Sequence, residues 1–466
     1  MRKYEKIGLP VLSAIMGLCA VLGLTVPRRA SANSAPSHYY GSTGSGSFIL
    51  TDCPVSVRHE QLTFNVGVDA DIFGIGESDP AEYKNTVTAE YTFYNPEDYD
   101  VHATLAFPFG NMPDYLWRDN DFESFFTPDN ITVDGTPVET RLRHTYAQYI
   151  YGEFDVDGQL ERLCDDYTDS FFVDKTKPIY RYDFTLLSDG GFAFFDYDGL
   201  NVCTNISGWA SCGPTKHKGL FTKADGNSYT VYVFGEEIDV SGRTSFYTDS
   251  RLEYPTSGKV TKSVVEELTY DDFIFGSFDE EKSVSRVDWH NAAVEIIDNT
   301  FASGYVLGIR DMYFYDSLMC WYEYDVDFPA RSTVVNSVTA PMFPSIDADY
   351  SPDLFEYNYL LTPASKWESF SDLDIRINTD AYLIEKSSFA NFEATDGGYY
   401  VHLDDLPEND LSFTLCESEN PEHKYSAIGH VLNIAVIALI VVIAIFVVYV
   451  LGVTISLCVL ESRRSK

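Results

Sequence analysis

One segment near the carboxyl end limits most strongly what this chain can become. Val431–Leu460 is a run of 30 residues without Asp, Glu, Lys, Arg or His. As a helix rising ~1.5 Å per residue it would be about 45 Å long, more than the ~30 Å hydrocarbon core of a bilayer. Because a buried core helix is rarely so long and so rich in Ile and Val, we expect a transmembrane helix within residues 429–460.

The residues after this run set its orientation. The tail, residues 461–466, reads ESRRSK and carries three basic residues. Basic residues next to a span stay on the cytoplasmic side. The sequence therefore predicts a single-pass protein of the cell membrane, with a cytoplasmic C-terminus and the bulk of the chain extracellular.

The amino end has the three parts of a secretory signal peptide. Basic residues at positions 2, 3 and 6 precede the uncharged run Ile7–Val26, and Ala30-Ser31-Ala32 offers small residues for cleavage. We expect a signal peptide over residues 1–32, cleaved after Ala32. The run is also long enough to span a bilayer uncut, so a retained span is the alternative.

The balance of charge excludes one class of partner. Lysine and arginine number 32 against 71 aspartates and glutamates, and the net charge is −39. Nucleic-acid binding needs a basic surface that neutralises phosphates, so we expect no nucleic-acid partner. Such a surface attracts cations or basic partners at short range, although a well-hydrated extracellular domain is the simpler interpretation.

Cysteine usage agrees with an exported chain. Six cysteines lie outside the two apolar runs, an even number that permits three disulfides in 15 possible pairings. Cys203 and Cys212 flank a loop of eight residues, and we expect them to close a local hairpin. Free, buried thiols are the alternative for some of the six. Because the chain has no C-x-x-C pair, a zinc site is not expected.

Alternating apolar and polar residues predict a mainly β extracellular part. A small-residue linker at 33–50 precedes an expected first β-sandwich at 51–150. Its strand-like stretches are Thr86–Tyr94, 100–107, 130–134 and 138–144, with a hairpin turn at 95–98 and a second hairpin joining the last two.

A mixed α/β segment at 151–305 and a second sandwich at 306–420 follow. The best helix spans 285–301, where an apolar stripe includes Trp289 and Ile296, while His290 lies off the stripe and is expected at the surface. Residues 262–275 are ambiguous between helix and strand. The expected strands of the second sandwich are 320–328, 332–340, 354–361, 373–378, 399–403 and 411–416.

Part of the first sandwich resembles a known extracellular domain. The stretch 87–96 (VTAEYTFYNP), the strand ending in Phe107-Pro108 and the hairpin around Asp134-Gly135 follow one another as in the VIT domain of inter-α-trypsin-inhibitor-like proteins and in exported bacterial β-sandwich membrane proteins. The chain departs from that family at Phe109-Gly110, where Leu-Pro is usual, and it lacks the D-x-S-x-S motif of the accompanying von Willebrand A domain. The resemblance implies a β-sandwich with an extracellular interaction role and brings no catalytic residue.

One loop has part of a calcium-binding pattern. Glu153, Asp155 and Asp157 alternate before Gly158, as in the first half of a calcium loop. The twelfth position is Cys164 instead of Glu, so the bidentate ligand is missing, and a solvated acidic turn is the simpler interpretation. Weak Ca²⁺ binding at this loop stays a hypothesis, and no other cofactor is expected.

Catalytic motifs are absent from the chain: it has no G-x-S-x-G, H-E-x-x-H or P-loop sequence. Carboxylate pairs of the kind used by glycosidases are too common in so acidic a chain to be specific. The aromatic stretch 321–324 could stack on sugars, but such alternation more often builds a core.

The function predicted from these features is that of a surface-anchored, non-catalytic binding protein. Its role would be adhesion, envelope assembly or capture of an extracellular protein or glycan. The alternative is a membrane-anchored carbohydrate-active enzyme or carbohydrate-binding module. A sensor subunit that signals through a partner's helix is a third possibility.

Overall fold

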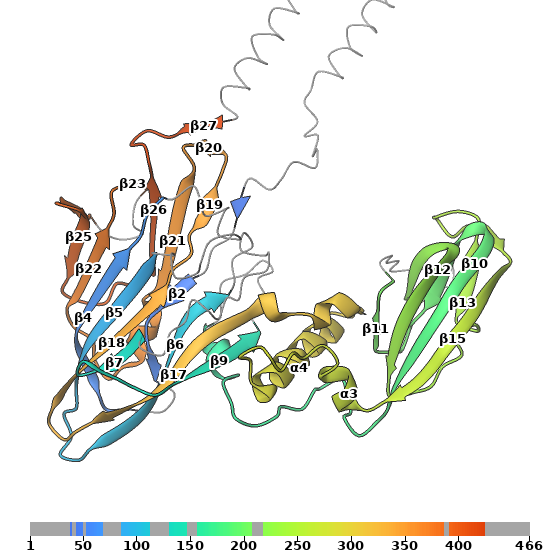
Figure 1. Cartoon of the computed structure of the whole chain (residues 1–466), viewed down its shortest axis with the longest axis horizontal. Helices are drawn as coiled ribbons and strands as arrows, with labels where there is room; N and C mark the ends of the chain where they lie inside the picture. Colours follow the sequence, from blue (N-terminus) through green and yellow to red (C-terminus); the bar gives the residue numbers. More distant parts are fainter. Residues whose placement is uncertain are drawn as a thin grey trace, which may run out of the picture.

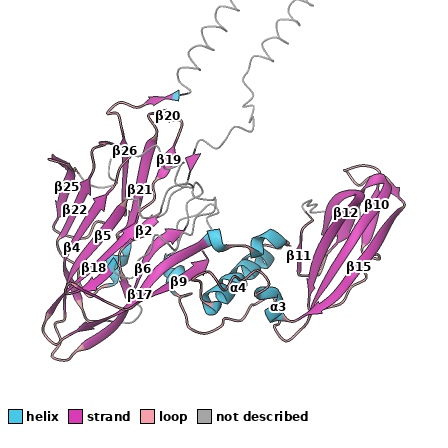
Figure 2. Cartoon of the chain, in the orientation of Figure 1, coloured by secondary structure: helices cyan, strands magenta, loops and turns pink. Residues whose placement is uncertain are grey.

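The computed structural model describes residues 38–39, 43–49, 53–68, 85–111, 130–146, 156–206, 218–385 and 391–424. The expected signal peptide, its cleavage site after Ala32, the expected transmembrane helix at 429–460 and the tail lie outside these residues. Within the described part of the chain, no helix is both long and apolar enough to cross a bilayer. Strands dominate, as expected for a mainly β chain (Figure 2).

One layer of the main body is an eight-stranded sheet, seen on the left of Figure 1. Its strands are, in spatial order, β24 (Glu393–Thr395), β25 (Gly398–Leu403), β22 (Leu373–Asn378), β4 (Ser56–Asn65), β5 (Thr86–Tyr94), β18 (Thr333–Pro341), β7 (Ile131–Val133) and β8 (Thr136–Pro137).

The facing layer consists of two smaller sheets. The first contains β1 (His38–Tyr39), β19 (Ser345–Asp347), β21 (Leu354–Leu360), β26 (Leu411–Cys416) and β23 (Tyr382–Glu385), with β2 (Thr43–Ser45) beside β21. The second contains β3 (Phe48–Ile49), β6 (Val101–Asn111), β17 (Leu318–Phe328) and β9 (Thr140–Tyr146). Phe64 of β4 meets Tyr359 and Phe413 of the facing layer edge-on, with ring centroids 5.6 and 5.3 Å apart. A further pair, β20 (Tyr350–Ser351) and β27 (Glu422–His423), lies beside these sheets.

The expectation of two separate sandwiches, at 51–150 and 306–420, is wrong. β5 pairs with β18 along its whole length, β4 pairs with β22, and β6 pairs with β17. Side chains from both stretches therefore fill one core. Alternation reveals which side chains of a strand face a core, but it does not reveal which strand lies beside it.

The hairpin predicted across the 95–98 turn is also wrong, because β5 and β6 lie in opposite layers. Asn95 organises this crossing. Its Nδ2 donates to the carbonyl oxygens of Tyr99 and Phe328 at 2.9 and 2.8 Å, and its Oδ1 accepts from the Glu97 N–H at 3.0 Å. Similarly, β9 pairs with β17 and not with β7.

A Gly- and Ser-rich linker was expected at 33–50, but the described residues of this stretch are part of the core. Ser45 and Ser47 are fully buried. The Ser47 N–H donates to Tyr91 Oη at 3.0 Å, and a Cβ added to Gly46 would lie 2.9 Å from the same oxygen. Small residues are needed here because the backbone passes directly over tyrosine side chains.

Residues 156–317, which we call the arm, are inserted between β9 and β17. They carry a second β body, on the right of Figure 1, with a core of its own. Its strands are, in spatial order, β14 (Pro255–Thr256), β13 (Thr244–Tyr247), β10 (Ile179–Asp196), β12 (Gly219–Phe234), β11 (Val202–Thr204) and β16 (Leu307–Gly308), with β15 (Gly258–Leu268) beside β10.

Helices of the arm lie between the two β bodies (Figure 2). They are α2 (Val156–Leu160), α3 (Tyr270–Ile274) and α4 (Arg286–Ala302), with 3₁₀ turns at Ile309–Met312 and Tyr315–Ser317, and a further one in the sandwich at Thr362–Lys366. The ambiguous stretch 262–275 divides between β15 and α3.

The predicted helix at 285–301 is confirmed as α4, with Ser285 as its N-cap. Trp289 is fully buried and stacks on Phe314 with centroids 4.0 Å apart. The expectation that His290 is a surface residue is wrong: it is 5% exposed, because the rings of Tyr167 and Tyr270 lie against it.

Candidate functional site at the root of the arm

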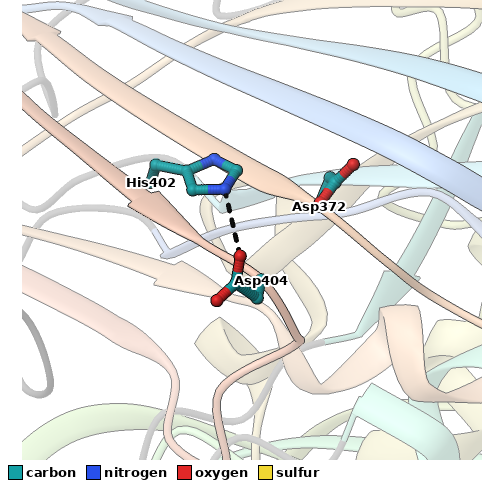
Figure 3. Close-up of side chains that lie close together, drawn as sticks. All are labelled: Asp372, His402 and Asp404. Atoms are coloured by element: carbon teal, nitrogen blue, oxygen red, sulfur yellow. Dashed lines mark ion pairs between the residues drawn. The ribbon is translucent and has the colours of Figure 1, made fainter.

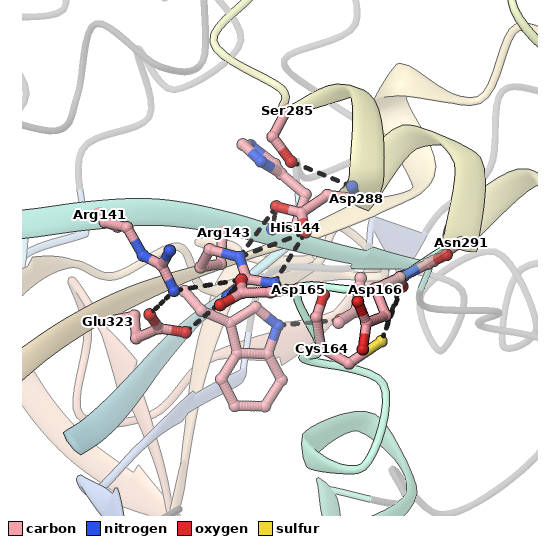
Figure 4. A network of polar contacts seen from close by, with 12 residues as sticks. Arg141, Arg143, His144, Cys164, Asp165, Asp166, Ser285, Asp288, Asn291 and Glu323 are labelled. Carbon is pink, nitrogen blue, oxygen red and sulfur yellow. Dashed lines mark hydrogen bonds and ion pairs between the residues drawn. The ribbon is translucent and has the colours of Figure 1, made fainter. Parts of the chain in front are cut away.

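Two clusters of polar side chains stand out among the described residues. The first, Asp372, His402 and Asp404, lies at the exposed end of β22 and β25 (Figure 3). The second, which we call the junction network, lies where the arm joins the sandwich (Figure 4). Its charged members are Arg141, Arg143, Asp165, Asp288 and Glu323. The junction network borders a cavity, which makes it the stronger candidate for a binding site.

Arg143 of β9 is the centre of the junction network, and its side chain is only 6% exposed. Nη1 donates to Glu323 Oε2 on β17 at 2.6 Å, while Nε and Nη2 donate to Asp288 Oδ1 on α4 at 3.2 and 3.0 Å. Burial opposes the charge of the guanidinium, but the carboxylates of Asp288, Glu323 and Asp165 outweigh this effect and raise the pKa of Arg143. Two strands of the sandwich and one helix of the arm are thus joined by buried ion pairs.

Asp288 also binds the strand backbone directly. Its Oδ2 accepts from the His144 N–H at 3.0 Å, and its own N–H donates to Ser285 Oγ at 3.0 Å. A carboxylate in the first turn of a helix is stabilised by the helix dipole. Asp288 therefore combines an electrostatic role in α4 with a direct connection from the arm to the sandwich.

The segment 162–171, which we call the strap, runs along a polar face of α4. Three side chains of α4, spaced three or four residues apart so that they share this face, bind the strap: Asn291 accepts from the Thr168 N–H at 2.9 Å, Glu295 pairs with Arg162 at 3.0 Å, and Asp298 accepts from the Phe171 N–H at 2.8 Å. The polar stripe of α4 is therefore an internal contact surface and is not left to solvent.

A cavity of about 180 Å³ lies between β9, the strap and α4. His144 in its wall is 4% exposed, and its Nδ1 has no hydrogen-bond partner among the described residues. Burial, together with the charge of Arg143, lowers the pKa of His144 to about 4, so the ring is neutral at physiological pH. The polar residues that line the cavity with it are Thr145, Tyr146, Glu161, Arg162, Thr168, Asn291 and Glu295.

Glu295 gives the cavity a second group of unusual acidity. Burial raises the pKa of Glu295 to about 7, although Arg162 acts in the opposite direction. A carboxyl group with this pKa can donate or accept a proton near neutral pH. The cavity offers hydrogen-bond donors and acceptors to a small polar ligand.

The sequence-predicted site residues lie elsewhere. Glu153 and Asp155 are outside the described residues, and Asp157 lies in α2, so the end of the expected calcium loop is helical. Cys203 is buried in β11, where burial raises the pKa of its thiol, while Cys212 is outside the described residues. The calcium site and the Cys203–Cys212 bridge both stay predictions.

Little in the sequence pointed to the junction network. Arg143 and Asp288 are 145 residues apart, and neither belongs to a recognised motif. The one available clue was an arginine within an alternating strand, since a buried arginine needs a carboxylate partner. The core interpretation of residues 321–324 is confirmed, because Trp321, Tyr322 and Tyr324 are buried.

Comparisons with known proteins provide no family assignment. No family model matches the chain, and no curated protein does. Among solved structures, the chain is similar to a Legionella pneumophila protein provisionally described as nutrient binding, with 13% identity over 81% of this chain and 72% of that one, at a TM-score of 0.29. A likeness at this level carries no inference about fold or function.

Proposed function

We propose that this protein is a membrane-anchored, non-catalytic extracellular binding protein whose arm carries the contact surface. The observation behind this proposal is the position of its exposed large apolar side chains. Ten such side chains occur among the described residues, and eight belong to the arm: Tyr167, Phe171, Leu187, Tyr254, Val264, Val265, Tyr305 and Tyr313.

Aromatic residues are enriched at the centres of protein interfaces, because they bury a large area at little cost in conformational entropy. Five of the eight arm residues are Tyr or Phe. The junction network supports the same proposal, since a contact surface is most effective when its support is rigid. The expected span at 429–460 would hold the sandwich at the membrane and leave the arm to reach its ligand.

Binding arrays with the full-length protein in detergent micelles test this proposal. The arm variant combines Phe171→Ala with Tyr254→Ala, and the control variant combines Tyr99→Ala with Tyr382→Ala, which removes two exposed rings from the sandwich. We expect a glycan or protein ligand to be retained by the wild type and the control, and its affinity for the arm variant to fall at least tenfold. Equal affinities for both variants would contradict the proposed surface.

One observation favours a second function, that of a carbohydrate-active enzyme. The cavity at the root of the arm contains Glu161 and Glu295, and the pKa of Glu295 is raised to about 7, as a general acid requires. Incubating the protein with the glycans that it retains separates the two functions. Cleavage products that disappear in Glu295→Gln would support the enzyme, whereas intact, retained glycans would support binding alone.

A further inference from the structure

The cluster of Asp372, His402 and Asp404 is built on two neighbouring strands. β22 and β25 are antiparallel, with Asp374 opposite His402, and the Asp372 N–H donates to the Asp404 carbonyl oxygen at 3.3 Å. Asp374 and His402 are opposite each other and therefore project from the same face of the sheet, while Asp372 and Asp404 lie immediately beyond the ends of the two strands. The ligand atoms of Asp372, His402 and Asp404 all lie within 4.8 Å of one another (Figure 3).

A second layer of contacts orients the imidazole. His402 Nδ1 lies 2.9 Å from Asp374 Oδ1, which also accepts from Tyr400 Oη at 2.5 Å. His59 Nε2 lies 3.7 Å from the other oxygen of Asp374. With Nδ1 bound to Asp374, the ring directs Nε2 toward Asp404 Oδ1, at 3.4 Å. A carboxylate that binds the second nitrogen of a histidine is the usual support of a metal ligand, since it fixes the tautomer and the ring orientation.

The charge around His402 is unbalanced. Three carboxylates, those of Asp372, Asp374 and Asp404, surround one imidazole. Among the described residues, the ion pairs of Asp374 and Asp404 are with histidines alone, and no lysine or arginine pairs with them. A divalent cation would neutralise this excess of negative charge.

We propose that Asp372, Asp404 and His402 Nε2 bind a divalent transition-metal ion of the Zn²⁺ class. One imidazole nitrogen and two carboxylate oxygens suit such an ion, which commonly takes three protein ligands and leaves a fourth position to water. Asp374 is a positioning residue for the metal site and not itself a ligand. The site is separate from the junction network and goes beyond the proposed binding function.

Calorimetric titration of the metal-stripped, full-length protein with Zn²⁺ tests the site. Excess Mg²⁺ is present throughout, so that weak, nonspecific binding of Zn²⁺ to the acidic surface does not contribute to the measured heat. We expect one saturable Zn²⁺ site per chain, with affinity reduced at least tenfold in His402→Gln and in Asp404→Asn, and by 10- to 100-fold in Asp374→Asn. Co²⁺ substituted for Zn²⁺ should give a visible ligand-field spectrum that His402→Gln alters.

His102 provides a matched control. It is exposed and pairs with Asp327 and Asp325 at 2.8 and 3.8 Å, but it is not part of a three-ligand cluster. His102→Gln should leave the affinity for Zn²⁺ and the Co²⁺ spectrum unchanged. The proposal is overturned if no saturable site is found, or if His402→Gln and Asp404→Asn bind Zn²⁺ as the wild type does. All the substituted side chains are exposed or half-buried, and a circular dichroism spectrum verifies that each variant is folded.

Discussion

Glu60 is the charged group that the sandwich core accommodates least easily. It lies on β4 with 1% of its surface exposed, and neither carboxyl oxygen has a hydrogen-bond partner among the described residues. Burial raises the pKa of Glu60 to about 8. The folded protein therefore holds a neutral, protonated Glu60 through the physiological pH range.

This raised pKa makes stability depend on pH with a definite sign. An unfolded chain releases the Glu60 proton near its ordinary pKa of about 4.3. Between that pH and about 8 the folded state binds more protons than the unfolded state, so the free energy of unfolding falls as pH rises. Each pH unit is equivalent to about 1.4 kcal/mol, which gives a loss of roughly 5 kcal/mol over the whole window.

Glu60→Gln removes the titrating proton and nearly keeps the shape of the side chain. We expect the variant and the wild type to have similar stability at pH 4.5, and the variant to be more stable by about 4–5 kcal/mol at pH 8. Chemical unfolding of both proteins at several pH values, followed by tryptophan fluorescence, measures this difference. Glu90→Gln, at an exposed position of the neighbouring strand β5, is the control and should show no such trend. A difference that does not change with pH would refute the reasoning.

Three further predictions can be followed in the same unfolding assay. Asp288→Asn removes one of the two buried carboxylates that pair with Arg143 and should cost about 3 kcal/mol, since Glu323 still balances part of the charge, whereas Asp165→Asn, at a side chain that is 73% exposed, should cost under about 1 kcal/mol. Gly46→Ala places a methyl group against the Tyr91 hydroxyl and should cost about 1–3 kcal/mol. Combining it with Tyr91→Phe should recover part of this loss in a double-mutant cycle. Trp289→Ala removes the ring that stacks on Phe314 and leaves a cavity in the core around α4. This should cost about 3–5 kcal/mol of stability.

The local strand pattern was predictable because it depends on neighbouring residues. Thr86–Tyr94, Leu373–Asn378 and Leu411–Cys416 have the bounds expected from alternation and turn residues. The same is true of α4, whose N-cap and apolar stripe lie within one short stretch. In each case the information needed to place the element is contained in the element itself.

Pairing between strands was not predictable, because it depends on partners far away in sequence. Within 51–150, the strands that form the core show the same alternation of apolar and polar residues as the two strands of a hairpin. Asn95 followed by Pro96 has the composition of a tight turn. The bond from Asn95 to the Phe328 carbonyl, 233 residues later, turns this stretch into a crossing between layers. Similarly, a Gly- and Ser-rich stretch indicates a linker unless tyrosine hydroxyls such as that of Tyr91 are known to lie against it.

His290 shows why the candidate site was also missed. A helical wheel of α4 identifies one apolar stripe and assigns the remaining positions to solvent. The strap covers part of that second face, so Asn291, Glu295 and Asp298 have internal partners, and Tyr167 of the strap covers His290. Polar residues on a helix can face solvent or bind a neighbouring segment of the chain, and the sequence does not distinguish these two arrangements.

The way the arm is attached follows from where it is inserted. β9 and β17 pair directly, with Tyr146 opposite Leu318, so the chain leaves and re-enters the sandwich at one place. A two-stranded root of this kind would permit rotation, and the strap's polar contacts with α4 join the arm to itself. Among the described residues, the strap reaches the sandwich only near its start, where the Cys164 carbonyl oxygen accepts from Arg143 Nη2 at 2.9 Å and the exposed Asp165 pairs with Arg141 and Arg143. Asp288 makes the buried connection, because it extends from α4 to Arg143 and to the backbone of His144 in the sandwich. The direction of the arm, and with it the placement of the exposed aromatic residues, therefore depends more on this one buried carboxylate than on the many contacts within the arm.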